Sequence, residues 1–135
     1  MKAGEATLQK LLNTSRQFIV PIFQRNFSWE KKQFQQLWED IRRAGSFSQE
    51  RTHFIGSIVY IDMGTPAGRP QQLMLIDGQQ RLTTLSLIIC ALRRYVAANK
   101  TATALIKEQK LNNQFLFNSD EAGNDRYKLL LGAQD

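Results

Sequence analysis

The alternation of apolar and polar positions is most informative in the middle of the chain. Residues 73–76 form a short apolar run with the composition of a buried strand, and Asp77-Gly78 follows it directly. From Gln79 to about Ala98, apolar residues recur at helical spacing, which predicts a long helix. The positions of this helix expected to face the core are Leu82, Leu85, Ile88, Ile89, Leu92, Tyr95 and Val96. The pattern therefore predicts a strand, a tight turn and a helix in direct succession.

A second strand is predicted just before this unit. Residues 54–61 are rich in β-branched and aromatic side chains, which is typical of a central strand. Gly56 interrupts them and indicates either a bulge or a close approach of another part of the molecule. Glycine and proline breakers follow between residues 62 and 70, so we expect residues 54–61 and 73–76 to pair as an antiparallel hairpin.

The N-terminal part contains shorter periodic segments. They predict a short helix within residues 5–13 and a brief strand over residues 18–20. A longer helix is predicted from an N-cap at Ser28 to about Arg43, with Gly45 in the position of a C′ glycine. The expected buried stripe of that helix consists of Phe34, Leu37, Trp38 and Ile41.

The C-terminal part gives a weaker signal. Residues 103–110 are compatible with a helix, and residues 114–117 and 127–131 are expected to form a hairpin around the polar loop 118–125. The mixture of elements predicts an α+β fold in a single domain over residues 1–135. The chain stops just after an apolar strand, which favours the N-terminal fragment of a longer protein.

Composition and charge narrow the class of protein. One cysteine and one histidine among 135 residues exclude an internal disulfide and argue against a structural metal site. The longest apolar run, Leu87–Leu92, is too short for a membrane span, and no secretory signal is visible, so a cytoplasmic protein without membrane contact is expected. The net charge of +6 favours an anionic partner such as a nucleotide or nucleic acid.

The predicted turn at Asp77-Gly78 has the chemistry of an anion site. Glycine lets a ligand approach the backbone closely, and the helix that follows directs its unpaired N–H groups and positive dipole end towards the turn. Arg81, in the first turn of that helix, adds a planar, permanently charged donor suited to phosphate. These features predict a phosphate-binding junction.

Three motifs resemble one known family. They are residues 19–29 (IVPIFQRNFSW), residues 54–59 (FIGSIV) and residues 76–85 (IDGQQRLTTL). In this order they resemble the N-terminal domain of GmrSD-type modification-dependent restriction enzymes, long catalogued as a domain of unknown function. The resemblance covers nearly the whole chain.

This resemblance implies a ParB/sulfiredoxin-like fold, a small mixed sheet with helices, and a site that binds and hydrolyses a nucleoside triphosphate (NTP) with Mg²⁺. In that superfamily the turn reads Gly-Glu-Arg-Arg in ParB and Gly-Cys-His-Arg in sulfiredoxin. Gly78 and Arg81 match the shared ends of this pattern. Because no cysteine stands at the turn, sulfiredoxin chemistry is not expected.

The resemblance also implies partners. Family members act in bacterial defence against phage DNA with modified bases, and they usually continue into a helical region and often an HNH-type nuclease domain. We therefore expect the chain to control such a C-terminal region, to meet DNA through it, and to cleave no DNA alone.

Site residues are expected at the turn and in the upstream motifs. Asp77 is either a turn or N-cap carboxylate or, as the resemblance favours, a direct or water-mediated Mg²⁺ ligand or a residue that orients the attacking water. The expected catalytic residues are Asp77, Gln80 and Arg81, and the expected nucleotide-binding residues are Gln24, Arg25, Gly56, Gly78, Gln79 and Thr83.

Other polar and aromatic residues leave alternatives open. Arg25 is either a second phosphate-side or catalytic contact, as the resemblance favours, or an ion-pair partner of Asp40 or Glu39 on the next helix. Trp29 and Trp38 could stack a base, although aromatics at helical spacing usually belong to the core. Cys90 is expected to be inert packing.

Two further functional hypotheses compete with an NTPase. In one, the chain is a DNA-binding module whose doublets Arg42-Arg43 and Arg93-Arg94 contact the phosphate backbone. In the other, it binds a nucleotide without hydrolysing it, because catalytic groups lie in a C-terminal region. The absence of a P-loop lysine motif requires any NTPase to use the turn at residues 77–81.

Overall fold

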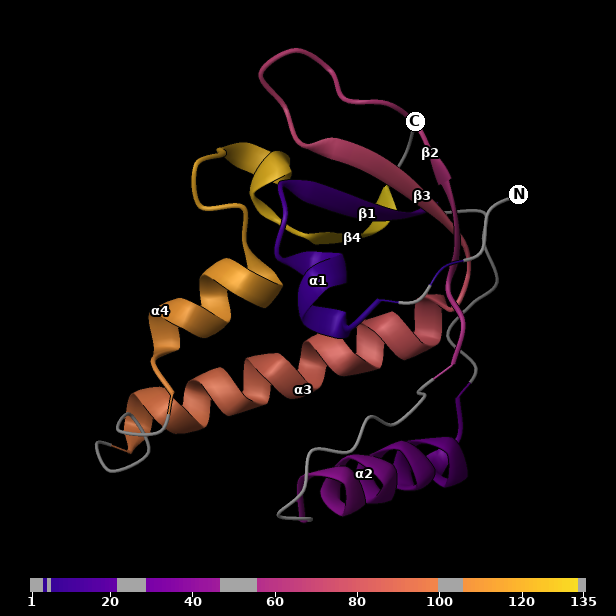
Figure 1. Cartoon of the computed structure of the whole chain (residues 1–135), viewed down its shortest axis with the longest axis vertical. Coiled ribbons are helices and arrows are strands. Elements are labelled where there is room, and N and C mark those ends of the chain that lie inside the picture. The colour runs from indigo at the N-terminus through magenta and orange to yellow at the C-terminus, as the bar shows by residue number, and fades with distance from the viewer. Residues whose placement is uncertain (1–3, 5, 22–28, 47–55, 100–105, 134–135) are drawn as a thin grey trace.

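The structure is a computed structural model that describes residues 4, 6–21, 29–46, 56–99 and 106–133 (Figure 1). Within these residues a four-stranded mixed sheet is covered by helices, so the predicted α+β class is confirmed. The strands are β1 (Arg16–Pro21), β2 (Val59–Asp62), β3 (Gln71–Asp77) and β4 (Leu129–Ala133). The α-helices are α1 (Leu8–Leu12), α2 (Lys31–Ser46), α3 (Gln79–Ala98) and α4 (Glu108–Leu111). A π-helical turn, η2 (Asn112–Leu116), and a 3₁₀ turn, η3 (Gly123–Arg126), complete the set.

The strand order in the sheet is β2-β3-β1-β4. β2 pairs antiparallel with β3, which confirms the predicted hairpin, whereas β1 lies parallel to both β3 and β4. The prediction of a central strand over residues 54–61 is wrong: β2 starts at Val59, lies at the edge of the sheet and has all four residues exposed. Its β-branched and aromatic residues satisfy strand geometry without requiring burial on both faces. Residues 54 and 55 lie outside the described residues.

The core joins the sheet to α1 and α3. Five side chains form its centre, each at most 3% exposed: Leu12, Phe18, Leu73, Leu75 and Leu82. Burial of such side chains stabilises a fold by roughly 1.5–3 kcal/mol each. Since Leu75 lies two residues before Asp77 and Leu82 four residues after Gly78, the core fixes both arms of the junction between β3 and α3.

The bounds of α2 and α3 lie close to the predicted ones, but several side chains that were expected to face the core are exposed. α3 has the expected bounds, but Leu92 and Tyr95 are 39% and 60% exposed and do not face the core. In α2 only Leu37 of the predicted stripe is buried, while Phe34 and Trp38 are exposed, because this helix lies to one side of the body (Figure 1). Gly45 lies inside α2 without the positive φ of a C′ glycine, and Ser28 lies outside the described residues.

The predicted C-terminal hairpin is mostly wrong. Phe117 and Tyr127 form one isolated antiparallel bridge, but residues 114–116 belong to the π-helical turn η2. β4 pairs with β1 instead, parallel and with Phe18 opposite Leu129. Of the predicted helix at residues 103–110, α4 contains only Glu108 onwards, and residues 103–105 lie outside the described residues.

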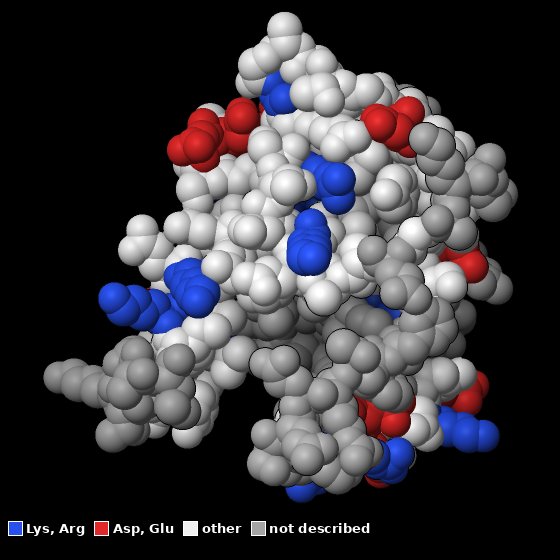
Figure 2. Space-filling model, viewed as in Figure 1, with Lys and Arg blue, Asp and Glu red and all other residues white. Residues whose placement is uncertain are grey.

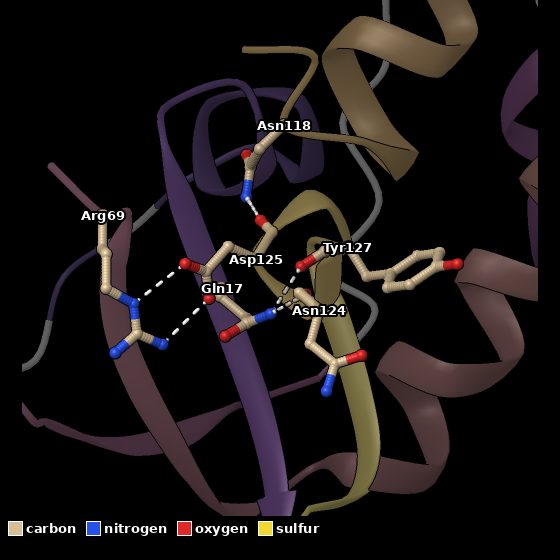
Figure 3. A network of polar contacts seen from close by, with 6 residues as sticks. All are labelled: Gln17, Arg69, Asn118, Asn124, Asp125 and Tyr127. Carbon is tan, nitrogen blue, oxygen red and sulfur yellow. Dashed lines mark hydrogen bonds and ion pairs between the residues drawn. The ribbon is translucent and has the colours of Figure 1, made fainter. Parts of the chain in front are cut away.

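A polar network holds the C-terminal segment against the sheet (Figure 3). The buried Gln17 of β1 donates from Nε2 to the carbonyl oxygens of Asn124 and Tyr127. Arg69 forms a bidentate ion pair with Asp125, with N···O distances of 2.8 and 2.9 Å. The Arg69 guanidinium lowers the pKa of the Asp125 carboxyl through this hydrogen bond. These side-chain bonds therefore tie residues 124–127 to β1 and to the loop before β3.

Lys128 is the buried cation of this region. It is 3% exposed, and its Nζ donates to the carbonyl oxygen of Thr14 and to Oδ1 of Asn118, both at 2.9 Å. Asn118 in turn donates to the carbonyl oxygens of Arg16 and Asp125. Both partners of Lys128 are neutral, and burial lowers the pKa of its ammonium from 10.5 to about 8.

The lowered pKa of Lys128 predicts a pH-dependent stability. Because the folded protein holds fewer protons than the unfolded chain between about pH 8 and 10.5, the free energy of unfolding should gain up to about 3 kcal/mol across this window. Urea unfolding at pH 7.5 and 10.5 measures it. Lys128→Met should lose this gain, whereas the exposed control Lys110→Met should keep it. A gain of equal size in all three proteins would contradict the assignment to Lys128.

None of the helices in the described segments is long and apolar enough to cross a membrane.

Candidate functional site

The candidate site is the turn between β3 and α3. β3 ends at Asp77, and Gly78 takes the N-cap position of α3 with φ of 88° and ψ of 10°. Asp77 Oδ1 accepts the Gly78 N–H at 2.9 Å, so Asp77 is a turn carboxylate and not the N-cap. Glycine is required at Gly78 because its left-handed backbone conformation is strained for residues with a Cβ.

The turn is in tight contact with the segment that precedes β2. A Cβ on Gly78 would lie 2.9 Å from the carbonyl oxygen of Ser57 and 3.2 Å from Cα of Ile58. Only a glycine therefore lets the start of α3 sit this close to residues 57–58.

Arg81 is held by the same segment. Its Nη1 donates to the carbonyl oxygen of Ser57 at 3.1 Å. Its guanidinium lies against Gly56, where a Cβ would be 2.6 Å from Nε and Nη1 of Arg81. The close approach expected at Gly56 is thus made by Arg81, and Gly56 contributes by leaving room for that side chain.

A pocket of about 270 Å³ opens at the turn. It is lined by Trp29, Gln33, Asp77, Gly78, Gln79, Gln80 and Arg81. Five of these residues are consecutive. Of the other two, Trp29 lies just before α2 and Gln33 lies in the first turn of α2. The fold therefore brings a second element to the predicted junction.

Gln79 is the most informative polar side chain of the pocket. It is 7% exposed, and no hydrogen bond of its amide is found within the described part of the chain. An amide on the pocket wall that makes no hydrogen bond within the protein can bind a ligand through its oxygen or its NH₂ group. Gln80, also buried at 8% exposure, lies beside it in the pocket wall.

The electrostatics of the turn favour an anion. Gly78 offers no side-chain cap to α3, and the first helical turn contains no acidic residue. Among the described residues, no side chain caps the N–H groups that begin α3; the one carboxylate at the turn, Asp77, accepts the Gly78 N–H instead. Arg81 adds a full positive charge at the same place, where a purely structural cation would be unfavourable.

The structure brings together most of the residues predicted at the turn. Asp77, Gly78, Gln79, Gln80 and Arg81 share the pocket. Thr83 is half-buried in α3 and is not among the pocket residues. Gln24 and Arg25 lie outside the described residues.

Gln33 is a pocket residue that the sequence pattern did not predict, and Trp29 is one for which the pattern left two roles open. Gln33 occupies an exposed helical position without any local signal of function. The sequence allows Trp29 to be a base-stacking residue or a core aromatic, and only the tertiary structure places it in the pocket wall.

The pocket offers few protein ligands for a divalent cation. No group of three or more His, Cys, Asp or Glu side chains suited to a metal occurs among the described residues. Asp77 is exposed, and its Oδ1 is engaged by the backbone, which leaves Oδ2 for a further contact. Mg²⁺ is commonly bound by one or two carboxylates together with substrate phosphates. The donor set therefore suits Mg²⁺ carried by a polyphosphate.

Comparison with known proteins identifies a related family. Residues 8–135 match the family described as "GmrSD restriction endonuclease, N-terminal domain". A search of curated proteins finds no significant match.

Proposed function

This chain belongs to the GmrSD restriction endonuclease N-terminal domain family, and we propose that its pocket at the β3–α3 turn binds and hydrolyses a nucleoside triphosphate. Membership indicates a domain of a restriction-type defence protein. The observation that carries the nucleotide proposal is the pocket itself, where an uncapped helix N-terminus, the Arg81 guanidinium and the amide side chain of Gln79 meet.

In this proposal the phosphates lie at the turn. The N–H groups at the start of α3 and the Arg81 side chain donate to phosphate oxygens, and the Gln79 amide donates to a further oxygen. The hydrogen bond from Arg81 to the Ser57 carbonyl uses one N–H of the guanidinium and orients the others. Gly78 and Gly56 provide the space for this arrangement.

Hydrolysis of the triphosphate depends mainly on well-placed charges and a well-placed water molecule, and little on covalent chemistry by the protein. Phosphoryl transfer is accelerated by charges that stabilise the transferring group and by a residue that orients the attacking water. Arg81 supplies the charge, and Asp77 holds Mg²⁺ or orients water with its free carboxylate oxygen. Gln80, whose neutral amide is a poor base, is assigned to water or phosphate positioning. Mg²⁺, bound with the nucleotide, neutralises phosphate charge.

We further propose that nucleotide turnover controls an effector nuclease region attached to this domain, through which the protein meets DNA. In this proposal the ligand contacts the start of α3, which packs on the sheet through the buried Leu82. A ligand at the turn can thus act on a rigid element of the domain.

Isothermal titration with NTP, with and without Mg²⁺, tests the proposal, together with an assay for released phosphate. We expect saturable one-to-one binding that Mg²⁺ strengthens, followed by phosphate release. Binding without phosphate release would support the nucleotide-binding site but contradict the proposed hydrolysis. The absence of any binding at millimolar NTP would reject the site.

A DNA-binding module without NTPase activity has less support. The basic groups on the face shown in Figure 2 form small patches separated by neutral surface and interspersed with acidic groups. Arg93 forms an ion pair with Glu108 at 3.3 Å. A low-salt gel shift with duplex DNA distinguishes the two functions, because nonspecific duplex binding depends steeply on salt.

A further inference from the structure

The pocket wall contains an aromatic ring as well as the polar turn. Trp29 lines the pocket together with residues 77–81, although it precedes a different helix, α2. A phosphate group alone needs only donors and positive charge. An indole in the same wall matches a ligand that has a flat aromatic group in addition to its anionic end.

The ring of Trp29 retains a surface for stacking. It is half-buried and makes an edge-to-face contact with Phe34, with ring centroids 5.5 Å apart and an interplanar angle of 71°. An edge-to-face contact covers at most one face of the indole. The Phe34 ring therefore supports Trp29 and leaves an indole face that this contact does not use.

The chain around Trp29 is fixed by a local hydrogen bond. The Gln33 side chain, which also lines the pocket, accepts the backbone N–H of Glu30 with Oε1 at 3.0 Å. This bond fixes the backbone directly after Trp29 at the start of α2, while the contact with Phe34 supports the ring itself. A preorganised aromatic ring loses less entropy on binding than a mobile one.

From this arrangement we propose that Trp29 stacks on the base of the nucleotide whose phosphates bind at the β3–α3 turn. The inference rests on the proposed function and adds a base-recognition residue to it. Because every base has a π-face, stacking on Trp29 raises affinity for nucleotides relative to a bare polyphosphate without itself choosing among bases.

Tryptophan fluorescence tests the stacking directly. The chain has two tryptophans, and Trp38 is 51% exposed on α2 and is not among the pocket residues. In a Trp38→Phe variant the signal comes from Trp29 alone. We expect NTP to quench this emission saturably, and inorganic tripolyphosphate at equal occupancy to leave it nearly unchanged.

Affinity measurements with the same two ligands complete the test. Trp29→Ala should weaken NTP binding about 10-fold, as expected for one lost base stack, and leave tripolyphosphate binding unchanged. Trp29→Phe retains an aromatic ring and should bind NTP within a few-fold of the parent protein. If Trp29→Ala fails to fold, the NTP affinity of Trp29→Phe and the quenching of Trp29 fluorescence still decide whether Trp29 stacks on the base.

The outcomes separate this inference from the proposed function. If NTP binds in an Arg81-dependent way without quenching Trp29, stacking is overturned while the phosphate site stands. Equal affinity losses for NTP and tripolyphosphate in Trp29→Ala would also overturn stacking, since they indicate a structural role. If neither ligand binds the parent protein, the proposed function and this inference fall together.

Discussion

Replacement of Arg81 by alanine is expected to lower the affinity for NTP by about 10- to 100-fold, because charge-assisted hydrogen bonds contribute roughly 1.5–3 kcal/mol. The same change should scarcely affect folding. The one hydrogen bond of Arg81 identified in the described structure goes to the Ser57 carbonyl, and Ser57 is exposed, so water replaces the lost donor. Titration calorimetry measures the affinity and thermal unfolding the stability.

Arg94→Ala is the matched control for Arg81→Ala. Arg94 is an exposed arginine of the same helix and is not among the pocket residues. It changes the net charge by the same amount, so any long-range effect of charge appears equally in both variants. Equal affinities for Arg81→Ala and the unaltered protein would remove Arg81 from the site. Equal losses in Arg81→Ala and Arg94→Ala would indicate general electrostatic attraction instead of a local contact.

Replacement of Gly78 by alanine is expected to destabilise the fold by about 3 kcal/mol and to abolish nucleotide binding. Two effects add up. The left-handed backbone at φ of 88° is strained for alanine, and the new Cβ would lie 2.9 Å from the Ser57 carbonyl oxygen, which belongs to the backbone and cannot swing away like a side chain. The turn must then separate from residues 57–58, and Arg81 loses its acceptor.

Gly64→Ala separates the two contributions. Gly64 also has a positive φ, 94°, but a Cβ there meets nothing within 4 Å. Its replacement should cost only the backbone strain, about 1–2 kcal/mol, and should leave nucleotide affinity unchanged. Comparison of the two midpoints of urea unfolding gives the contribution of the tight contact at Gly78. If both variants lose the same stability and bind NTP equally well, the contact with residues 57–58 does not position the site.

The junction between β3 and α3 was predictable because its signals are local. An apolar run, Asp77-Gly78 and a helical pattern from Gln79 occupy consecutive positions, so neighbouring residues alone specify the strand, the turn and the helix. The antiparallel pairing of β2 with β3 followed for the same reason, since the breakers between the two strands leave a short connection.

The errors concern contacts between segments distant in sequence. β2 had the composition of a central strand, yet the parallel pairing of β1 with β3 left β2 at the edge. The local pattern predicts a hairpin for residues 127–131, but β4 pairs with the distant strand β1. Local composition cannot report which of two pairings buries more apolar surface or satisfies more backbone groups.

By itself the sequence specified a glycine turn after a buried strand, the start of a long helix and an arginine in the first turn of that helix. Tertiary structure alone decided that the Ser57 carbonyl holds Arg81, that Gln79 is buried at the pocket, and that Trp29 joins the pocket wall. The physical reason is that turn and helix preferences act between neighbours in the chain. The shape of a pocket depends on which distant surfaces exclude water together.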